Sequence, residues 1–125
     1  MNTFFAATRE ELTNTSMSSR IMGRFHIKNI LPHTGEIALN ETGIVMNDWK
    51  SIKWSDIKSA DIENDKYFSS VMVATQSRLF FSKSAKPIKL QLTNDEVVYF
   101  YVDWNFATGL SNNKKVFNDI QKYLS

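Results

Sequence analysis

The sequence predicts an α+β domain, built as a curved antiparallel β-sheet or barrel of about seven or more strands and capped by one C-terminal helix. Two observations support this fold class. From residue 20 to residue 102, short stretches of alternating apolar and polar residues follow one another, separated by clusters of Asn, Asp, Gly, Ser or Pro. Near the C-terminus the apolar residues instead recur at helical spacing. With 125 residues, the chain has the length of one domain.

The N-terminal segment shows no such alternation. It is mostly polar after a small apolar patch at Phe4 to Ala7. We therefore predict a flexible N-terminal arm over 1–19, with one helical turn near Thr8 to Leu12. The two phenylalanines of the patch are expected to pack against the body of the protein. A single domain is then expected over 20–125.

The first strand of this domain is expected at residues 20–28. Ile21, Phe25 and Ile27 lie on one side of an extended chain, and the other side is basic. The side chains of this basic face are Arg20, Arg24, His26 and Lys28.

Further alternating stretches predict the remaining strands. They are expected near residues 37–39, 44–46, 51–54, 57–63, 71–77, 79–81, 88–93 and 97–102. Clusters of turn-forming residues predict turns at 32–35, 40–43, 64–66 and 94–95. The last strand, 97–102, is apolar on both faces, so we expect cover on each side of it. The closing helix is expected to supply cover and to bury Val116, Phe117, Ile120 and Leu124.

One connection requires a local irregularity. Ile57 lies an odd number of residues from Ala60 and from Ile62, so the three side chains cannot share one face of a regular strand. We therefore expect Ser55-Asp56 to turn or bulge the chain, since short polar side chains bond readily to nearby backbone.

The run GEIALNETGIVMN, which starts at Gly35, and the later run IKWSDIKSADI resemble the pattern of GRAM domains and bacterial pleckstrin-homology-like domains. In those families a hairpin opened by Gly, with a T-x-x-G-type turn, precedes an I-x-W/Y-x-D-I-x-S strand pair. The resemblance implies a pleckstrin-homology-like barrel closed by the C-terminal helix. It also implies that anionic lipid head groups bind near the first two strands and their connecting loop.

The sequence contains no pattern that indicates catalysis or a cofactor. It has no nucleophile motif, no phosphate-binding Gly-rich loop and no helical zinc-binding motif. It also has no Cys, and its two histidines, His26 and His33, stand seven residues apart, which is not a chelating spacing. We therefore expect a non-enzymatic protein that holds neither a metal nor a cofactor.

Charge and hydropathy leave the partner open. The net charge of +2 permits an acidic partner without requiring one. No stretch approaches the roughly 20 apolar residues of a membrane span. The N-terminus lacks the early positive region of a secretory signal. The expected location is the cytoplasm, with attachment to a membrane surface as the alternative.

Two groups of residues are candidate binding surfaces. The first expectation is contact with a protein partner or with a second copy, because the aromatic residues exceed what one small core holds. The candidates for this surface are Trp49, Tyr67, Tyr99, Tyr101 and Trp104. The alternative is an anionic lipid head group on the basic face of residues 20–28. A second alternative is single-stranded nucleic acid, which the weak net charge disfavours.

Overall fold

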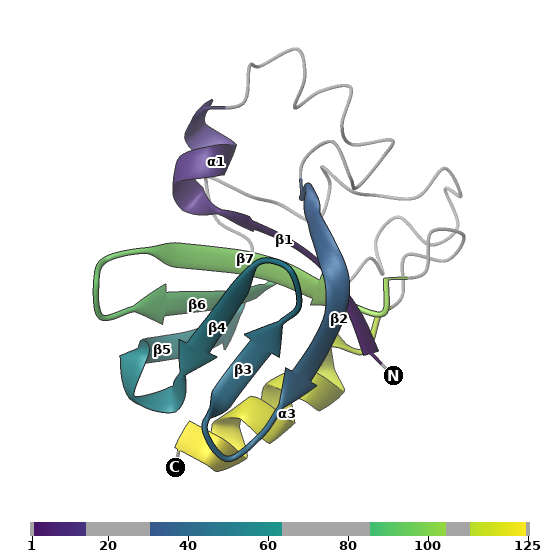
Figure 1. The fold of residues 1–125 in the computed structure, drawn as a ribbon, viewed down its shortest axis with the longest axis vertical. Coiled ribbons are helices and arrows are strands. Elements are labelled where there is room, and N and C mark those ends of the chain that lie inside the picture. Colours follow the sequence, from purple (N-terminus) through teal and green to yellow (C-terminus); the bar gives the residue numbers. More distant parts are fainter. Residues whose placement is uncertain (1, 15–30, 64–85, 105–110, 125) are drawn as a thin grey trace.

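The computed structural model describes residues 2–14, 31–63, 86–104 and 111–124 (Figure 1). Within these ranges seven strands form one antiparallel sheet in the order β4-β3-β2-β1-β7-β6-β5. The strands are β1 (Asn2–Thr8), β2 (His33–Leu39), β3 (Gly43–Met46), β4 (Lys50–Lys53), β5 (Ile57–Ile62), β6 (Ile88–Leu92) and β7 (Val97–Val102). The helices are α1 (Arg9–Asn14), the short 3-10 helix η2 (Trp54–Asp56) and α3 (Asn113–Leu124). The strands expected at 20–28, 71–77 and 79–81 lie outside the described residues.

The sheet curls until it is nearly closed (Figure 1). Its two end strands, β4 and β5, follow each other in the chain and are joined by η2. The helix α3 lies across one end of the curled sheet and packs on β5 and β7. The α+β class, the antiparallel sheet and the C-terminal helix predicted from the sequence are therefore confirmed. In the described ranges, no helix is long and apolar enough to cross a membrane.

The central strand of the sheet is β1, and α1 follows it. The prediction of a flexible arm over 1–19 is therefore wrong for residues 2–14. Strand β1 pairs with β2 on one side and with β7 on the other. Phe4 and Ala6 face the barrel interior, whereas Ala7 belongs to a second apolar cluster outside it. Because both faces are buried, apolar and polar residues do not alternate along β1. Residues 15–19 lie outside the described part of the chain.

The turn expected at Ser55-Asp56 is confirmed, and a β-bulge follows it. The helix η2 turns the chain between β4 and β5. In β5 the register with β6 shifts between Ile57 and Ser59, which leaves Lys58 as an extra residue. The extra residue brings Ile57 and Ala60 onto the same buried face, and this explains their odd spacing.

Among the described residues the core has two parts, one inside the barrel and one on the outer face of β7. The interior part contains residues of all seven strands and of α3. The outer part packs Leu12 of α1 and Leu31 against Tyr99 and Tyr101 of β7. All six residues of β7 are buried, so the cover expected on both of its faces is confirmed. The C-terminal helix α3 packs on the interior part, and α1 covers the outer face.

A buried asparagine joins the start of α3 to the end of the sheet. Asn113 is 2% exposed. Its Oδ1 accepts a hydrogen bond from the N–H of Val102 (2.7 Å), and its Nδ2 donates one to the carbonyl of Lys86 (2.8 Å). The N–H of Asn112 also donates to the Val102 carbonyl (2.8 Å). These bonds hold α3 where its apolar face closes the barrel.

Asn113→Ala is expected to lower the free energy of unfolding by about 1–3 kcal/mol, because the buried N–H of Val102 loses its hydrogen-bond acceptor. Urea unfolding followed by tryptophan fluorescence measures the difference. The matched control is Asn118→Ala, which removes the same side chain from an exposed position of α3. We expect this control to change the free energy by less than about 0.5 kcal/mol. Equal losses in the two variants would contradict the role given to Asn113.

Candidate functional site

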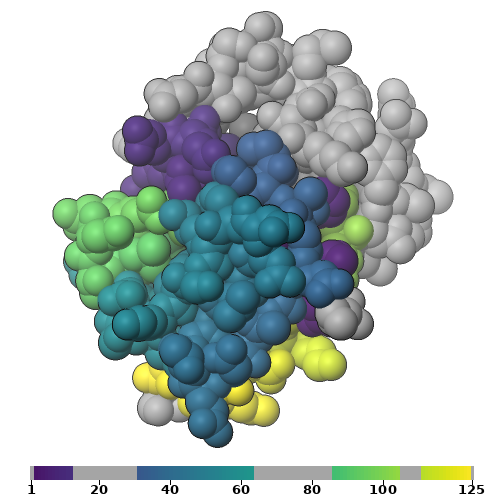
Figure 2. All heavy atoms as spheres, viewed as in Figure 1, coloured from purple at the N-terminus to yellow at the C-terminus, as the bar shows by residue number. Residues whose placement is uncertain are grey.

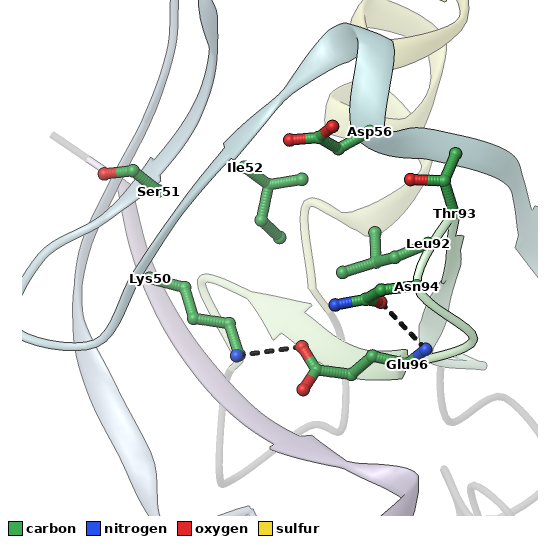
Figure 3. Close-up of a pocket in the computed structure, with 8 residues that line it drawn as sticks. All are labelled: Lys50, Ser51, Ile52, Asp56, Leu92, Thr93, Asn94 and Glu96. Atoms are coloured by element: carbon green, nitrogen blue, oxygen red, sulfur yellow. Dashed lines mark hydrogen bonds and ion pairs between the residues drawn. The ribbon is translucent and has the colours of Figure 1, made fainter.

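A cavity of about 300 Å³ lies between β4 and the turn that joins β6 to β7 (Figure 3). Figure 2 shows these two segments side by side on one face of the molecule, the β3–β4 hairpin in teal and the β6–β7 turn in green. Ile52 and Leu92 form an apolar floor and are 5% and 7% exposed. The other lining residues are polar or charged: Lys50, Ser51, Asp56, Thr93, Asn94 and Glu96.

The inward-facing side chains of β4 form one wall of this cavity. Lys50 is opposite Met46 of β3, and Ile52 is opposite Ile44. Because Met46 and Ile44 belong to the interior core, Lys50 and Ile52 lie on the inner side of the strand. The Nζ of Lys50 reaches across the cavity to within 2.8 Å of Glu96 Oε1 (Figure 3).

The β6–β7 turn and η2 form the opposite wall. Asp95 has a left-handed backbone, with φ of 70°, so the turn expected at 94–95 is confirmed. The side chain of Asn94 accepts a hydrogen bond from the N–H of Glu96 (3.0 Å), which orients the residue that meets Lys50. Farther along, the N–H of Thr93 donates to the carbonyl of Asp56 (2.9 Å). A salt bridge therefore bounds one end of the cavity, and a backbone hydrogen bond bounds the other.

The strand β4 is also one end of the sheet. Among the described residues it pairs with β3 alone. The other end strand, β5, lies beside α3, and the side chain of Gln121 donates to the carbonyl of Ala60 (3.3 Å). The helix thus covers β5, whereas within the described part of the chain β4 presents an open edge.

The hydrogen bonds between β3 and β4 indicate which backbone groups form this edge. The N–H of Trp54, just after β4, donates to the carbonyl of Thr42 (3.2 Å). Such bonds recur at every second residue of an antiparallel pair, so the N–H and C=O groups of Ser51 and Lys53 point away from β3. Both side chains are exposed. Lys53 forms no ion pair with any other described residue.

The basic face proposed from the sequence cannot be placed relative to the cavity. Its four residues, Arg20, Arg24, His26 and Lys28, lie outside the described residues, as does Tyr67. The lipid site therefore stays a prediction.

Two aromatic residues predicted to contact a partner are buried instead. Tyr99 and Tyr101 have no exposed surface. Two nitrogens of Arg9 donate to the Tyr99 hydroxyl (3.1 and 2.9 Å), and burial raises the pKa of Tyr101 well above its ordinary value. The prediction was wrong because a surplus of aromatic residues does not indicate which of them are buried, and Leu12 of α1 and Leu31 pack on both of these rings. Trp49 and Trp104 are half-buried, and Trp104 contacts Tyr101 with ring centroids 4.9 Å apart.

Trp49 belongs to a cluster that joins α1 to β2. The ring of His33 stacks on Trp49, with centroids 4.3 Å apart, and its Nε2 lies 2.6 Å from Glu11 Oε2. Glu11 also accepts a hydrogen bond from the N–H of Thr8 (2.9 Å), whose hydroxyl accepts one from the N–H of Glu11 (3.2 Å). This reciprocal pair is a capping box that starts α1. Groups of three or more potential metal ligands are absent from the described ranges.

The pKa of Glu11 reflects these contacts. Burial by itself raises the pKa of the carboxyl, but the hydrogen bonds from Thr8 and His33 and the charge attraction of His33 outweigh burial. The pKa of Glu11 therefore lies below its ordinary value of 4.5.

Sequence reasoning did not single out the cavity residues. They come from β4 and from the β6–β7 turn, which are distant in the chain and meet only in the folded sheet. One usable signal was the four-residue strand KSIK, because lysines on a short strand are typical of a sheet edge. No protein-family model matches the chain, and comparisons with curated proteins and with solved structures gave no significant match.

Glu11→Ala is expected to lower the free energy of unfolding by about 0.5–2 kcal/mol at neutral pH, because α1 loses its capping box. A carboxyl with a lowered folded-state pKa stabilises the protein fully above its unfolded-state pKa. That stabilisation is lost as the pH falls through the folded-state pKa. The difference in the free energy of unfolding between Glu11→Ala and wild type should therefore become smaller as the pH falls below 4.5, the ordinary pKa of the carboxyl.

Urea unfolding at neutral pH and at about pH 3 measures this dependence. Glu41→Ala is the control, since Glu41 is exposed in the 40–43 turn. A difference for Glu11→Ala that stays constant with pH would show that its charge has no part in stability.

Proposed function

We propose that this chain is a non-enzymatic protein-interaction module of the pleckstrin-homology-like type, and that β4 binds an extended segment of a partner protein. The observation that carries the proposal is the open edge of β4 beside a cavity with an apolar floor. An extended segment on this edge gains main-chain hydrogen bonds with Ser51 and with the N–H of Lys53, whose carbonyl begins η2. One of its side chains enters the cavity, which is the general mode of strand addition to a sheet.

The order of the strands supports the pleckstrin-homology-like type. Strands β1 to β4 and strands β5 to β7 form two antiparallel groups joined by β1 and β7, and α3 follows the last strand. A curved sheet capped by a C-terminal helix is what the resemblance of the run from Gly35 implies.

The cavity lining supports binding rather than catalysis. Among its described residues, Ser51 points away from the cavity in Figure 3, and Glu96 pairs with Lys50. Ser51 is therefore not turned toward the cavity, and the carboxylate of Glu96 is held in an ion pair rather than placed beside that hydroxyl as a general base.

The proposal predicts that peptides selected for binding to the protein occupy β4. Peptides enriched from a random display library should bind Ser51→Pro at least about tenfold more weakly than wild type, because proline removes an outward N–H donor. Proline is tolerated on edge strands, so the fold should persist. Fluorescence anisotropy measures the affinities, and circular dichroism checks the fold.

Ser51→Ala is the matched control, since it removes the hydroxyl and keeps the backbone donor. It should bind like wild type. Slower hydrogen exchange at the amides of Ser51 and Lys53 in the peptide complex is expected as an independent readout. The proposal fails if no peptide is enriched, or if enriched peptides bind wild type and Ser51→Pro equally well.

Charge distribution favours a second candidate function, binding of an anionic membrane surface. Residues 15–30 and 64–85 together contain six Lys and Arg but a single Asp, whereas acids outnumber bases in the described ranges. The mild basic bias of the chain therefore comes from segments that include the basic face of residues 20–28.

The membrane candidate predicts that Arg24→Glu combined with Lys28→Glu reduces binding to anionic vesicles by at least about tenfold, since each basic residue contributes about 1 kcal/mol at such a surface. Co-sedimentation with anionic and neutral vesicles at low and high salt measures the binding. Lys114→Glu combined with Lys115→Glu makes the same charge change on an exposed face of α3. An equal loss in both double variants, or no binding by wild type, would refute this candidate.

A further inference from the structure

We propose that the segment bound by β4 carries a β-branched apolar residue with an acidic residue on each side of it; this inference rests on the proposed function. Two features of the edge lead to it. The inner side of β4 carries Ile52, which forms the apolar floor of the cavity together with Leu92. The outer side presents Lys53, which has no ion-pair partner among the described residues.

The inner side selects the apolar residue. In a strand paired with β4, the residue opposite Ile52 points to the same side as Ile52, and therefore toward the cavity. Glu96 holds the ammonium group of Lys50 at the rim, 2.8 Å away, so the charge of Lys50 is already balanced there. What the entering side chain meets is the floor of Ile52 and Leu92. A β-branched side chain suits such a pleated, half-buried surface.

The outer side selects the acidic residues. The two neighbours of the central residue lie opposite Ser51 and Lys53 and point to the same outer side as these exposed side chains. One neighbour is directly opposite Lys53, and the other is diagonal to it. Opposite charges at these positions stabilise a strand pair, and like charges destabilise it. An acidic residue at each position therefore complements Lys53.

A second copy of this chain is a poorer occupant of the same edge. If two β4 strands paired around Ile52, the two copies of Lys53 would occupy diagonal positions and repel each other. Lysine on an edge strand is a common protection against such pairing. A lysine-rich segment meets the same repulsion.

Two synthetic peptides test the inference. Each has seven residues, capped ends, a central valine and threonine at the outer positions, and they differ only in carrying glutamate or lysine on both sides of the valine. Fluorescence anisotropy with the full chain should give an affinity for the glutamate peptide about three- to tenfold higher. This ratio should shrink at high salt, because Lys53 is exposed.

Charge reversal at Lys53 sharpens the test. Lys53→Glu should invert the preference, so that the lysine peptide binds more tightly. Lys115→Glu, the same change at an exposed position of α3, should keep the preference of wild type. Ser51→Pro should lower the affinity of the protein for both peptides. Both lysines are exposed, so neither reversal disturbs the core.

The outcomes separate this inference from the proposed function. Equal affinity for the two peptides, or tighter binding of the lysine peptide by wild type, overturns the inference. If neither peptide binds while library-selected peptides compete at β4, the inference fails and the proposed function stands. If no peptide of any kind binds at β4, both fail. Concentration-dependent dimerisation that is lost in Ser51→Pro would assign the edge to a second copy and also overturn the inference.

Discussion

The pairing of β1 with β7 is the interaction on which the rest of the barrel depends. It joins strands β1 to β4 and strands β5 to β7 into one sheet. Asp103 extends the pairing beyond β7, since its N–H donates to the carbonyl of Thr3 (2.9 Å) and its Oδ1 accepts from the N–H of Thr3 (2.8 Å). The left-handed backbone of Asp103, with φ of 52°, ends β7 at this point. The side chain also accepts a hydrogen bond from Asn112 (2.6 Å), the residue before α3.

A contact between residues 100 positions apart requires strong burial, because the entropy of closing so long a loop opposes it. Burial on both faces of β1 supplies this stabilisation. Phe4 enters the interior core, and Ala7 joins the outer cluster with Leu12 of α1. The capping box of Thr8 and Glu11 starts α1 directly after β1, so the helix is positioned to cover the outer face. Residues 2–14 are therefore an integral part of the fold.

Sequence patterns predicted the described strands β2 to β7 and the helix α3, and they missed β1. The strand β6 and the helix α3 were predicted because Ile88, Leu90 and Leu92, or Val116 and Ile120, recur at the period of their element. The strand β1 has no such period because it is covered twice. Lys89 stands between Ile88 and Leu90, where alternation would expose it to solvent, yet it is 7% exposed and pairs with Glu63 (3.1 Å). Burial of this kind depends on neighbouring elements, which local periodicity does not contain.

The candidate site could not be predicted from local sequence patterns either, because it also depends on elements that are distant in the chain. Its walls are β4 and the β6–β7 turn, which are distant in the chain and meet through the complete strand order of the curled sheet. The prediction of an aromatic binding surface was wrong for Tyr99 and Tyr101, because the number of aromatic residues does not indicate which of them other elements bury. Once α1 packs on β7, the rings of Tyr99 and Tyr101 become core.

The strand order is also the reason why we propose β4, rather than β5, as the strand that binds a partner segment. Both end the sheet, but α3 packs along β5, while β4 is held by its inner neighbour and at its ends. A Cβ atom at Gly43 would lie 2.8 Å from the carbonyl carbon of Ile52 and from the Cα of Lys53, so glycine permits a very close approach of β3 and β4. The bridge from Lys50 to Glu96 anchors the start of β4 to the far wall. An edge held in this way loses little conformational freedom when a segment docks on it, and such preorganisation favours binding.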